Sequence, residues 1–185
     1  MLDITKIPRM ETHAHSWYSN TRLIDSINDP KKMIQHCADI GLKGCVLTDH
    51  EALCGHVVWL NAEKELKEKG TIPKDFKCGL GNEIYLVEER KNKQKYYHFI
   101  LIAKDAIGYK ALKELSSTAW YNLYVDRGME RVPTTKQELA DIVNKYKGHL
   151  IATTACLGGE LSTHALAMYE AQMVNDIKTA NEHYQ

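Results

Sequence analysis

The chain has 185 residues, enough to bury the core of one domain, and its 44% hydrophobic and 26% charged residues are typical of a soluble globular protein. Its 24 basic and 24 acidic residues give a formal net charge of zero. A dedicated nucleic-acid-binding domain usually carries a basic excess. We therefore do not expect strong DNA affinity from this segment by itself.

The cysteines argue against two structural classes. Their number is odd and no Cys-x-x-Cys pair occurs, which disfavours both a disulfide framework and a zinc finger. Free cysteines suit a reducing cytoplasm. The longest apolar runs, such as 99–103, are too short for a signal peptide or a membrane span. We expect a cytoplasmic protein with no membrane segment.

Strands and helices alternate along the predicted chain. Asp29 and Pro30 mark one helix start as N-cap and first helical residue, and Thr135 with Glu138 forms a capping-box pattern at another. The apolar patterns predict strands over 8–16, 44–47, 77–87, 96–103 and 149–152, and helices over 30–40, 52–69, 105–120, 135–146 and most of 160–185. Between them we expect a polar stretch over 17–28, a charged hairpin turn over 88–95 and a loop with a little helix over 121–135.

This alternation predicts an α/β fold built from βαβ units, with a largely parallel sheet or barrel. In such folds, chemically active side chains gather where strands end and loops begin. Residues near the predicted strand ends are therefore the first candidates for a site.

His13 and His15 are the first such candidates. Residues i and i+2 of a strand point to the same side, so an extended segment directs both imidazoles into one pocket. Imidazole is the commonest side chain offered to a transition metal. A chain with nine histidines can produce this spacing by chance, so the interpretation depends on similar residues downstream.

Further metal-ligand types follow at or near other strand ends. They are Asp49 and His50, Glu83, His98, and Cys156. The spacing is too long for a zinc finger, but it is what a barrel produces when each strand contributes one ligand to a shared mouth.

Taken together, these motifs resemble the polymerase-and-histidinol-phosphatase (PHP) domain, and more narrowly the N-terminal PHP domain of the alpha subunit of bacterial DNA polymerase III. The likeness covers nearly the whole chain, and the motifs are specific jointly. They are His-x-His-Ser at 13–16, Thr-Asp-His at 48–50, Gly-x-Glu at 81–83, the lone strand histidine at 98 and Ala-Cys-Leu-x-Gly-Glu at 155–160.

The resemblance implies a distorted seven-stranded α/β barrel that holds up to three ions, commonly zinc, manganese or iron. It implies catalytic roles for His15, His50 and Glu83. Asp25 matches a ligand displaced by a few extra residues, although Leu23 to Asp25 could equally begin a helix. The full implied ligand set is His13, His15, Asp25, His50, Glu83, His98 and Cys156.

The chain departs from the family at its end. The family places its last two ligands in an Asp-x-His motif beyond the cysteine, whereas this sequence stops at Gln185 without one. We expect residues 1–185 to form a single PHP domain whose barrel lacks its last strands. An open barrel edge predicts self-association between chains. The missing ligands predict weak or undetectable hydrolysis by this chain alone.

Two functions of different classes remain open. The first is a metal-dependent phosphoesterase in a replicative polymerase, acting on a DNA 3′ end or on pyrophosphate. The second is an inactive metal-binding module that supports the polymerase core or its proofreading partner. In either case DNA, through the parent polymerase, and other replisome subunits are the expected partners.

Several other residues have two interpretations. Asp49 could orient a ligand or cap the next helix. Lys104 and Arg131 could meet a phosphate, although solvated charges are commoner. We interpret His36, His56 and His149 as structural, and Cys37, Cys45, Cys54 and Cys78 as small core residues.

Overall fold

The structure, a computed structural model, describes residues 7–22, 24, 26–174 and 176–184. Its helices are α1 (Pro30–Asp39), α2 (His56–Glu68), α3 (Ala106–Tyr121), α4 (Lys136–Lys145), α5 (Glu160–Met173) and α6 (Ile177–Tyr184), with a short 3-10 helix at Trp17–Thr21. Its strands are β1 (Met10–Ala14), β2 (Gly44–Leu47), β3 (Lys77–Val87), β4 (Tyr97–Ala103), β5 (Tyr124–Asp126), β6 (Met129–Arg131), β7 (Thr134–Thr135) and β8 (Leu150–Thr153).

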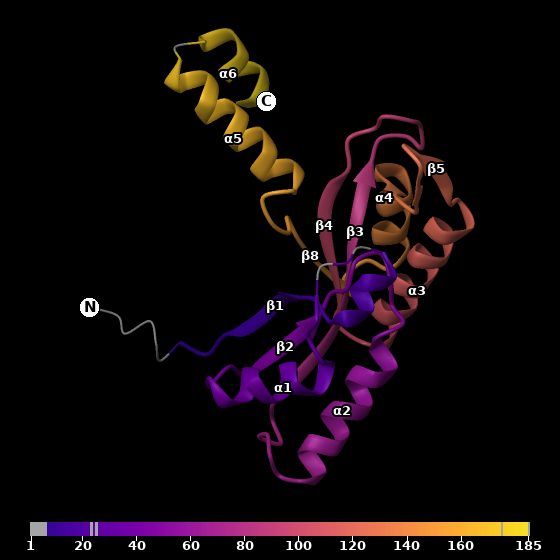
Figure 1. The fold of residues 1–185 in the computed structure, drawn as a ribbon, viewed down its shortest axis with the longest axis vertical. Coiled ribbons are helices and arrows are strands. Elements are labelled where there is room, and N and C mark those ends of the chain that lie inside the picture. Colours follow the sequence, from indigo (N-terminus) through magenta and orange to yellow (C-terminus); the bar gives the residue numbers. More distant parts are fainter. Residues whose placement is uncertain (1–6, 23, 25, 175, 185) are drawn as a thin grey trace.

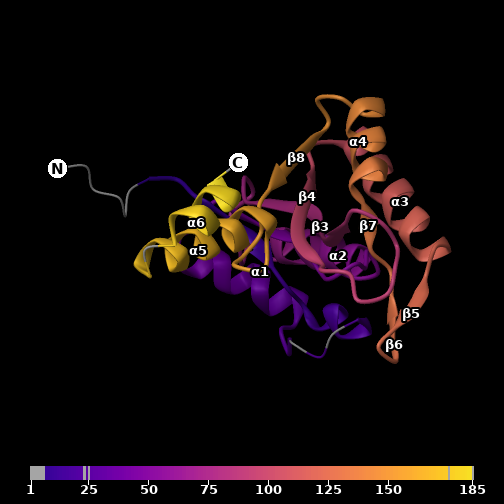
Figure 2. The same cartoon turned by 90° about the horizontal axis from the view of Figure 1, so that it is seen from above.

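The main sheet is mixed and curls into a half-barrel (Figures 1 and 2). Its strand order is β1-β2-β3-β4-β8, with β7 paired beside β3. β1, β2 and β3 run parallel, but β4 is antiparallel to both β3 and β8. The α/β class and the predicted hairpin over 88–95 are confirmed, and three of the five pairings in the described main sheet are parallel. The charged segment 88–95 joins β3 to β4 as a hairpin, and a hairpin can join only antiparallel neighbours.

Helices cover one face of the sheet in two groups. α1 and α2 pack on β2 through a cluster that includes Ile34, Leu47 and Trp59. α3 and α4 pack on β4 through a second cluster that includes Leu101 and Leu112.

The opposite, inner face of the sheet has a small apolar cluster of its own. Alternation along the strands directs Val46 to this face, where it contacts Ile100 and Ile102. The candidate ligands lie on this inner face.

The predicted helix starts are confirmed. The Asp29 side chain accepts a hydrogen bond from the backbone of Lys32, with Pro30 beginning the helix. Thr135 and Glu138 make both reciprocal bonds of a capping box. These signals succeed because they depend on side chains within one turn of the helix.

Residues 121–135 differ from the expected loop. They form a small antiparallel hairpin, β5–β6, followed by β7. Its two turn residues, Arg127 and Gly128, have φ of 52° and 75°. Two consecutive residues with positive φ fit the tight turn whose twist matches that of paired strands. The Asp-Arg-Gly sequence was the available signal for this hairpin.

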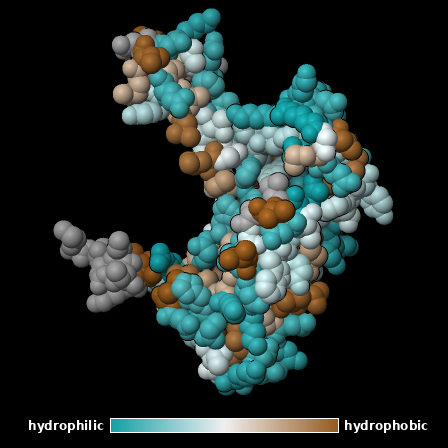
Figure 3. All heavy atoms as spheres, viewed as in Figure 1, coloured by the Kyte–Doolittle hydropathy of each residue, from teal (hydrophilic) through white to brown (hydrophobic). Residues whose placement is uncertain are grey.

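The last two helices, α5 and α6, pack on each other and project from the sheet as an arm (Figure 1). Several apolar side chains of this region are exposed, and Figure 3 shows brown patches along the arm. The exposed apolar side chains of α5 and α6 include Leu161, Met173 and Ile177, which are 65%, 67% and 73% exposed. No helix among the described residues combines the length and apolar character needed to cross a membrane.

His56 at the start of α2 gives the fold a predicted pH dependence. Its side chain is buried beside the Gly81 carbonyl, 2.9 Å from its Nε2. Burial lowers the pKa of His56 to about 4, although the bond to Gly81 acts in the opposite direction. Between pH 6.5 and 4, His56 therefore binds a proton in the unfolded chain but not in the folded chain. The free energy of unfolding should fall by about 3 kcal/mol through this group across that window.

Urea titrations at pH 7 and pH 4.5 measure this effect. His56→Gln keeps an N–H donor for the Gly81 carbonyl but does not titrate. The variant should lose this part of the pH dependence. Equal stability losses in the variant and the unsubstituted chain would show that His56 is not the group responsible.

Candidate metal centre

The predicted ligand residues meet at one end of the curled sheet. His13 lies in β1 and His15 just beyond it, while His50 follows β2. β4 runs antiparallel to its neighbours, so its first residues lie at the same end as the last residues of β3 and β8. That direction brings His98 and Cys156 to the same end of the sheet as the β1 and β2 ligands. Strand direction therefore assembles a group that is scattered over 144 positions from residue 13 to residue 156.

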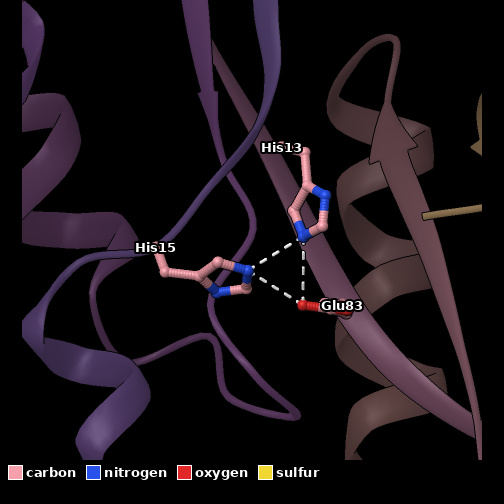
Figure 4. A group of neighbouring side chains, drawn as sticks. All are labelled: His13, His15 and Glu83. Atoms are coloured by element: carbon pink, nitrogen blue, oxygen red, sulfur yellow. Dashed lines mark hydrogen bonds and ion pairs between the residues drawn. The ribbon is translucent and has the colours of Figure 1, made fainter. Parts of the chain in front are cut away.

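His13, His15 and Glu83 form the first cluster (Figure 4). The two Nε2 atoms are 2.9 Å apart. Glu83 Oε2 is 2.9 Å from His15 Nε2 and 3.2 Å from His13 Nε2. Ligand atoms that each lie about 2.1 Å from a tetrahedral metal are about 3.4 Å from one another. The triangle of side-chain atoms is therefore close to the size that a small divalent ion requires.

Glu83, His98 and Cys156 form a second cluster. Glu83 Oε1 lies 2.7 Å from His98 Nδ1, and Cys156 Sγ lies 3.3 Å from the same nitrogen. The Gly158 backbone N–H donates to the cysteine sulfur at 3.4 Å. A Cβ on Gly158 would lie only 3.0 Å from the His98 ring, so this position favours glycine. Imidazole, carboxylate and thiolate together suit zinc or iron.

Glu83 belongs to both clusters and is fully buried. Burial alone would raise the pKa of its carboxyl, but close contacts with His13, His15 and His98, together with the charge of His50, hold that pKa well below its ordinary value. The carboxylate is therefore ionised. Its Oε1 meets His98 Nδ1 at 2.7 Å, but it makes no well-directed hydrogen bond to any described residue. A buried anionic oxygen that faces imidazole nitrogen in this way fits a metal ligand.

His50 lies against the first cluster. Its ring stacks on His15 with centroids 4.3 Å apart, and its Nδ1 is 3.2 Å from Glu83 Oε2. Asp25, the other ligand that the resemblance assigned to this part of the site, lies outside the described residues. The structure thus brings six of the seven implied ligand residues together around one carboxylate.

Two non-glycine residues with left-handed backbone flank these ligands. Glu51 follows His50 with φ of 50°, and Ala155 precedes Cys156 with φ of 55°. Each conformation costs about 1–3 kcal/mol and persists only where surrounding contacts enforce it. Ala155 packs against the inner-face cluster that contains Val46. The backbone is therefore strained at two positions directly beside candidate ligands.

Arg22, in the polar stretch after β1, joins the buried Glu51 side chain to the β5–β6 hairpin. Arg22 Nε donates to Glu51 Oε2 at 3.0 Å and a terminal nitrogen of Arg22 donates to the Glu130 carbonyl at 2.9 Å. The Arg22 guanidinium lies over the Trp120 ring, and Trp120 Nε1 donates to the Glu51 carbonyl. No local pattern indicates this set of contacts, because its members are up to 108 residues apart.

Tyr85 and Asp49 also lie beside the ligands. Tyr85 was not predicted as part of the site, and Asp49 had two interpretations. Tyr85 Oη lies 3.2 Å from His50 Nδ1, and its position two residues after Glu83 on β3 was the available signal. Asp49 binds Ser16 and Ser19, whereas α2 begins at His56 and its N-cap residue, Gly55, makes no side-chain cap. The helix-capping interpretation of Asp49 is therefore wrong. All five cysteines are free, but Cys54 is exposed, so its interpretation as a core residue is wrong.

Comparison with known proteins shows the family to which this chain is similar. The model of the PHP domain family matches residues 11–185. "Probable DNA polymerase YorL" of Bacillus subtilis is 40% identical over 179 residues, and the match covers 92% of this chain and 14% of that protein. The DNA-directed DNA polymerase of Bacillus phage SPbeta gives the same figures. The DNA polymerase III alpha subunit of Treponema pallidum is 30% identical over 156 residues, covering 80% of this chain and 12% of the subunit.

These relatives are much longer proteins, and the chain spans about one seventh of their length or less. The family match covers nearly the whole sequence and contains every residue of the two clusters. The fold, the curled half-barrel, is that of an incomplete PHP barrel. The chain belongs to the PHP domain family.

Proposed function

We propose that this chain is a metal-dependent phosphoesterase-type PHP domain of a replicative DNA polymerase. One ion would be held by His13, His15 and Glu83 and another by Glu83, His98 and Cys156, with His50 and Asp25 serving a further ion. Zinc, manganese and iron are the candidates, given the ligand types. The observation that carries the proposal is the single buried carboxylate, Glu83, shared by two three-residue clusters.

The residues divide the work of such a site between them. When bound, neighbouring divalent ions neutralise phosphate oxygens and lower the pKa of a bound water towards neutrality. Glu83 would hold two ions close together, because its two oxygens face different clusters. His15 and His50 stack on each other beside that carboxylate, and this contact would restrict the movement of both rings. Tyr85, hydrogen-bonded to His50, would hold that ring in place.

The wider setting is proposed from the relatives. Proteins with 40% and 30% identity to this chain are named DNA polymerases. We propose DNA, through the parent polymerase, and other replisome subunits as partners. The candidate substrates are a DNA 3′ end, as in a 3′–5′ exonuclease, and pyrophosphate. Both present phosphate oxygens to the same pair of metal positions.

Hydrolysis assays on the 185-residue chain test the proposal. Release of nucleotides from a 3′-labelled primer, of phosphate from pyrophosphate and of product from a chromogenic phosphoester should each be followed with and without added manganese. Any turnover should require divalent metal, stop in excess chelator and be lost in His15→Ala. His36→Ala is a matched control, because His36 is exposed on α1 away from both clusters.

Turnover that persists in His15→Ala or in chelator would show that this site is not its source. Metal binding with no turnover on any substrate is the result that the missing ligands predict for this chain, and it would support the second function, a metal-binding module for the polymerase, equally well. The absence of both binding and turnover would contradict the proposal.

We also propose that the open sheet edges pair between chains. In the described sheet β1 and β8 are the edge strands, and Met10 and Ile151 on them are 39% and 48% exposed. A hollow of about 770 Å³ is lined by residues of both edge strands, and its apolar lining residues include Val46, Ile102 and Ile151. Exposed edge strands are templates for pairing. Sedimentation should show mass increasing with concentration, and less so for Ile151→Lys. A clean monomer over a wide concentration range would contradict pairing.

A further inference from the structure

Ser19, in the 3-10 helix after β1, lies behind the first metal cluster and is fully buried. Its hydroxyl oxygen has three close partners. It is 2.9 Å from Asp49 Oδ1, 3.2 Å from the backbone nitrogen of His50 and 3.1 Å from His15 Nδ1. The serine therefore contacts two candidate ligand residues and the residue before one of them.

The hydrogen-bonding capacity of the hydroxyl assigns a role to each partner. A serine hydroxyl has one hydrogen to donate and two lone pairs that accept. Asp49 Oδ1 already accepts from the Ser16 backbone N–H at 2.7 Å, so it is an acceptor towards Ser19 as well. The hydrogen of Ser19 therefore goes to Asp49. The His50 backbone N–H can only donate, and it occupies one lone pair.

Only one lone pair of Ser19 remains for His15. At 3.1 Å the Nδ1 atom must then carry a hydrogen and donate it to the serine oxygen. In neutral imidazole a hydrogen on Nδ1 leaves Nε2 with a bare lone pair. That Nε2 faces Glu83 Oε2 and His13 Nε2, each 2.9 Å away, and bare acceptor atoms this close together need a cation between them.

We propose that Asp49 and Ser19 are positioning residues that lock His15 in the tautomer whose Nε2 is free to bind metal. This inference rests on the metal-binding function proposed above. Asp49 fixes the direction of the Ser19 hydrogen, and Ser19 in turn fixes the hydrogen on His15. Ser16 strengthens the arrangement, because its single hydroxyl hydrogen is shared between the two oxygens of Asp49, at 3.1 and 2.9 Å. The ring orientation of His15 is set before any ion arrives.

The tautomer of His15 can be measured without metal. Nitrogen-15 NMR of the histidine-labelled, metal-free 185-residue chain at pH 8 distinguishes a protonated Nδ1 from a bare one. We expect a protonated Nδ1 at His15. Ser19→Thr, which keeps the hydroxyl, should preserve that signal, and Ser19→Ala should give a mixture of tautomers. A bare Nδ1 in the unsubstituted chain would overturn the proposal even if Ser19→Ala failed to fold.

Metal affinity supplies the second readout, with zinc as the probe in calorimetric titrations. Ser19→Ala should bind 10- to 100-fold more weakly, the range typical for partners that orient a metal-binding histidine. Ser26→Ala is the matched control: Ser26 lies in the same polar stretch and donates to the His15 backbone carbonyl at 2.9 Å, but it does not hold the ring. Its affinity should stay within about threefold of the unsubstituted chain, well short of the effect at Ser19.

The two proposals fail in different ways. If the unsubstituted chain binds no zinc, the proposed function fails while the NMR measurement still decides the tautomer. If the chain binds zinc and Ser19→Ala binds it equally well, the positioning role fails while the metal site stands.

Discussion

Replacing Glu83 with glutamine should abolish metal binding at both clusters at once. Glutamine keeps the shape of the side chain but removes the charge that four histidines surround, with nitrogen-to-oxygen distances of 2.7 to 3.2 Å. Loss of a residue that merely orients a ligand costs about 10- to 100-fold in metal affinity, so loss of a shared ligand should cost more. We expect a fall of more than about 100-fold, and loss of any hydrolysis.

Calorimetric titration with zinc or manganese measures this effect. Glu68→Gln at the end of α2 is the matched control, because that side chain is 66% exposed and forms no part of either cluster. His98→Ala should remove only the second ion and leave the first. If Glu83→Gln still bound two ions with unchanged affinity, Glu83 would not be the shared ligand.

Replacing Trp59 with alanine should cost about 3–5 kcal/mol of folding free energy, the range measured for truncating large buried aromatic residues. Trp59 is 0% exposed and lies at the centre of the cluster that joins α1 and α2 to β2. Alanine would leave a cavity between these helices and the sheet. Because domains are stable by only about 5–15 kcal/mol, this single change could remove much of the stability.

Urea denaturation compared with Trp59→Phe tests the argument. The indole nitrogen of Trp59 has no hydrogen-bond partner among the described residues. Phenylalanine therefore keeps much of the volume and sacrifices no described hydrogen bond. It should cost clearly less than alanine. Equal losses in the two variants would show that packing volume is not what Trp59 contributes.

Features that depend on neighbouring residues could be predicted from the sequence. The bounds of β2 and β3 agree with the predicted strands at 44–47 and 77–87, because apolar runs and flanking turn residues mark them. The capped starts of α1 and α4 were recognised for the same reason. His13 and His15 were recognised by their spacing in a strand.

Features that depend on distant residues were not predicted. The predicted hairpin turn over 88–95 implied an antiparallel β4, but the antiparallel pairing of β8 with β4 joins strands far apart in the chain. The contacts of Ser19 with Asp49 and of Arg22 with Glu51 join residues about 30 positions apart. Single polar residues of these types are common on any surface, so no local pattern distinguishes a buried partner. The structure was needed to show which of them lie behind the ligands.

Anomalous diffraction from crystals of the 185-residue chain soaked in zinc tests the central claim most directly. We predict one peak within bonding distance of His13, His15 and Glu83, and a second within bonding distance of Glu83, His98 and Cys156. Glu83 should be the only residue that touches both peaks. The absence of a peak at both clusters, or peaks confined to other surface residues, would contradict the account.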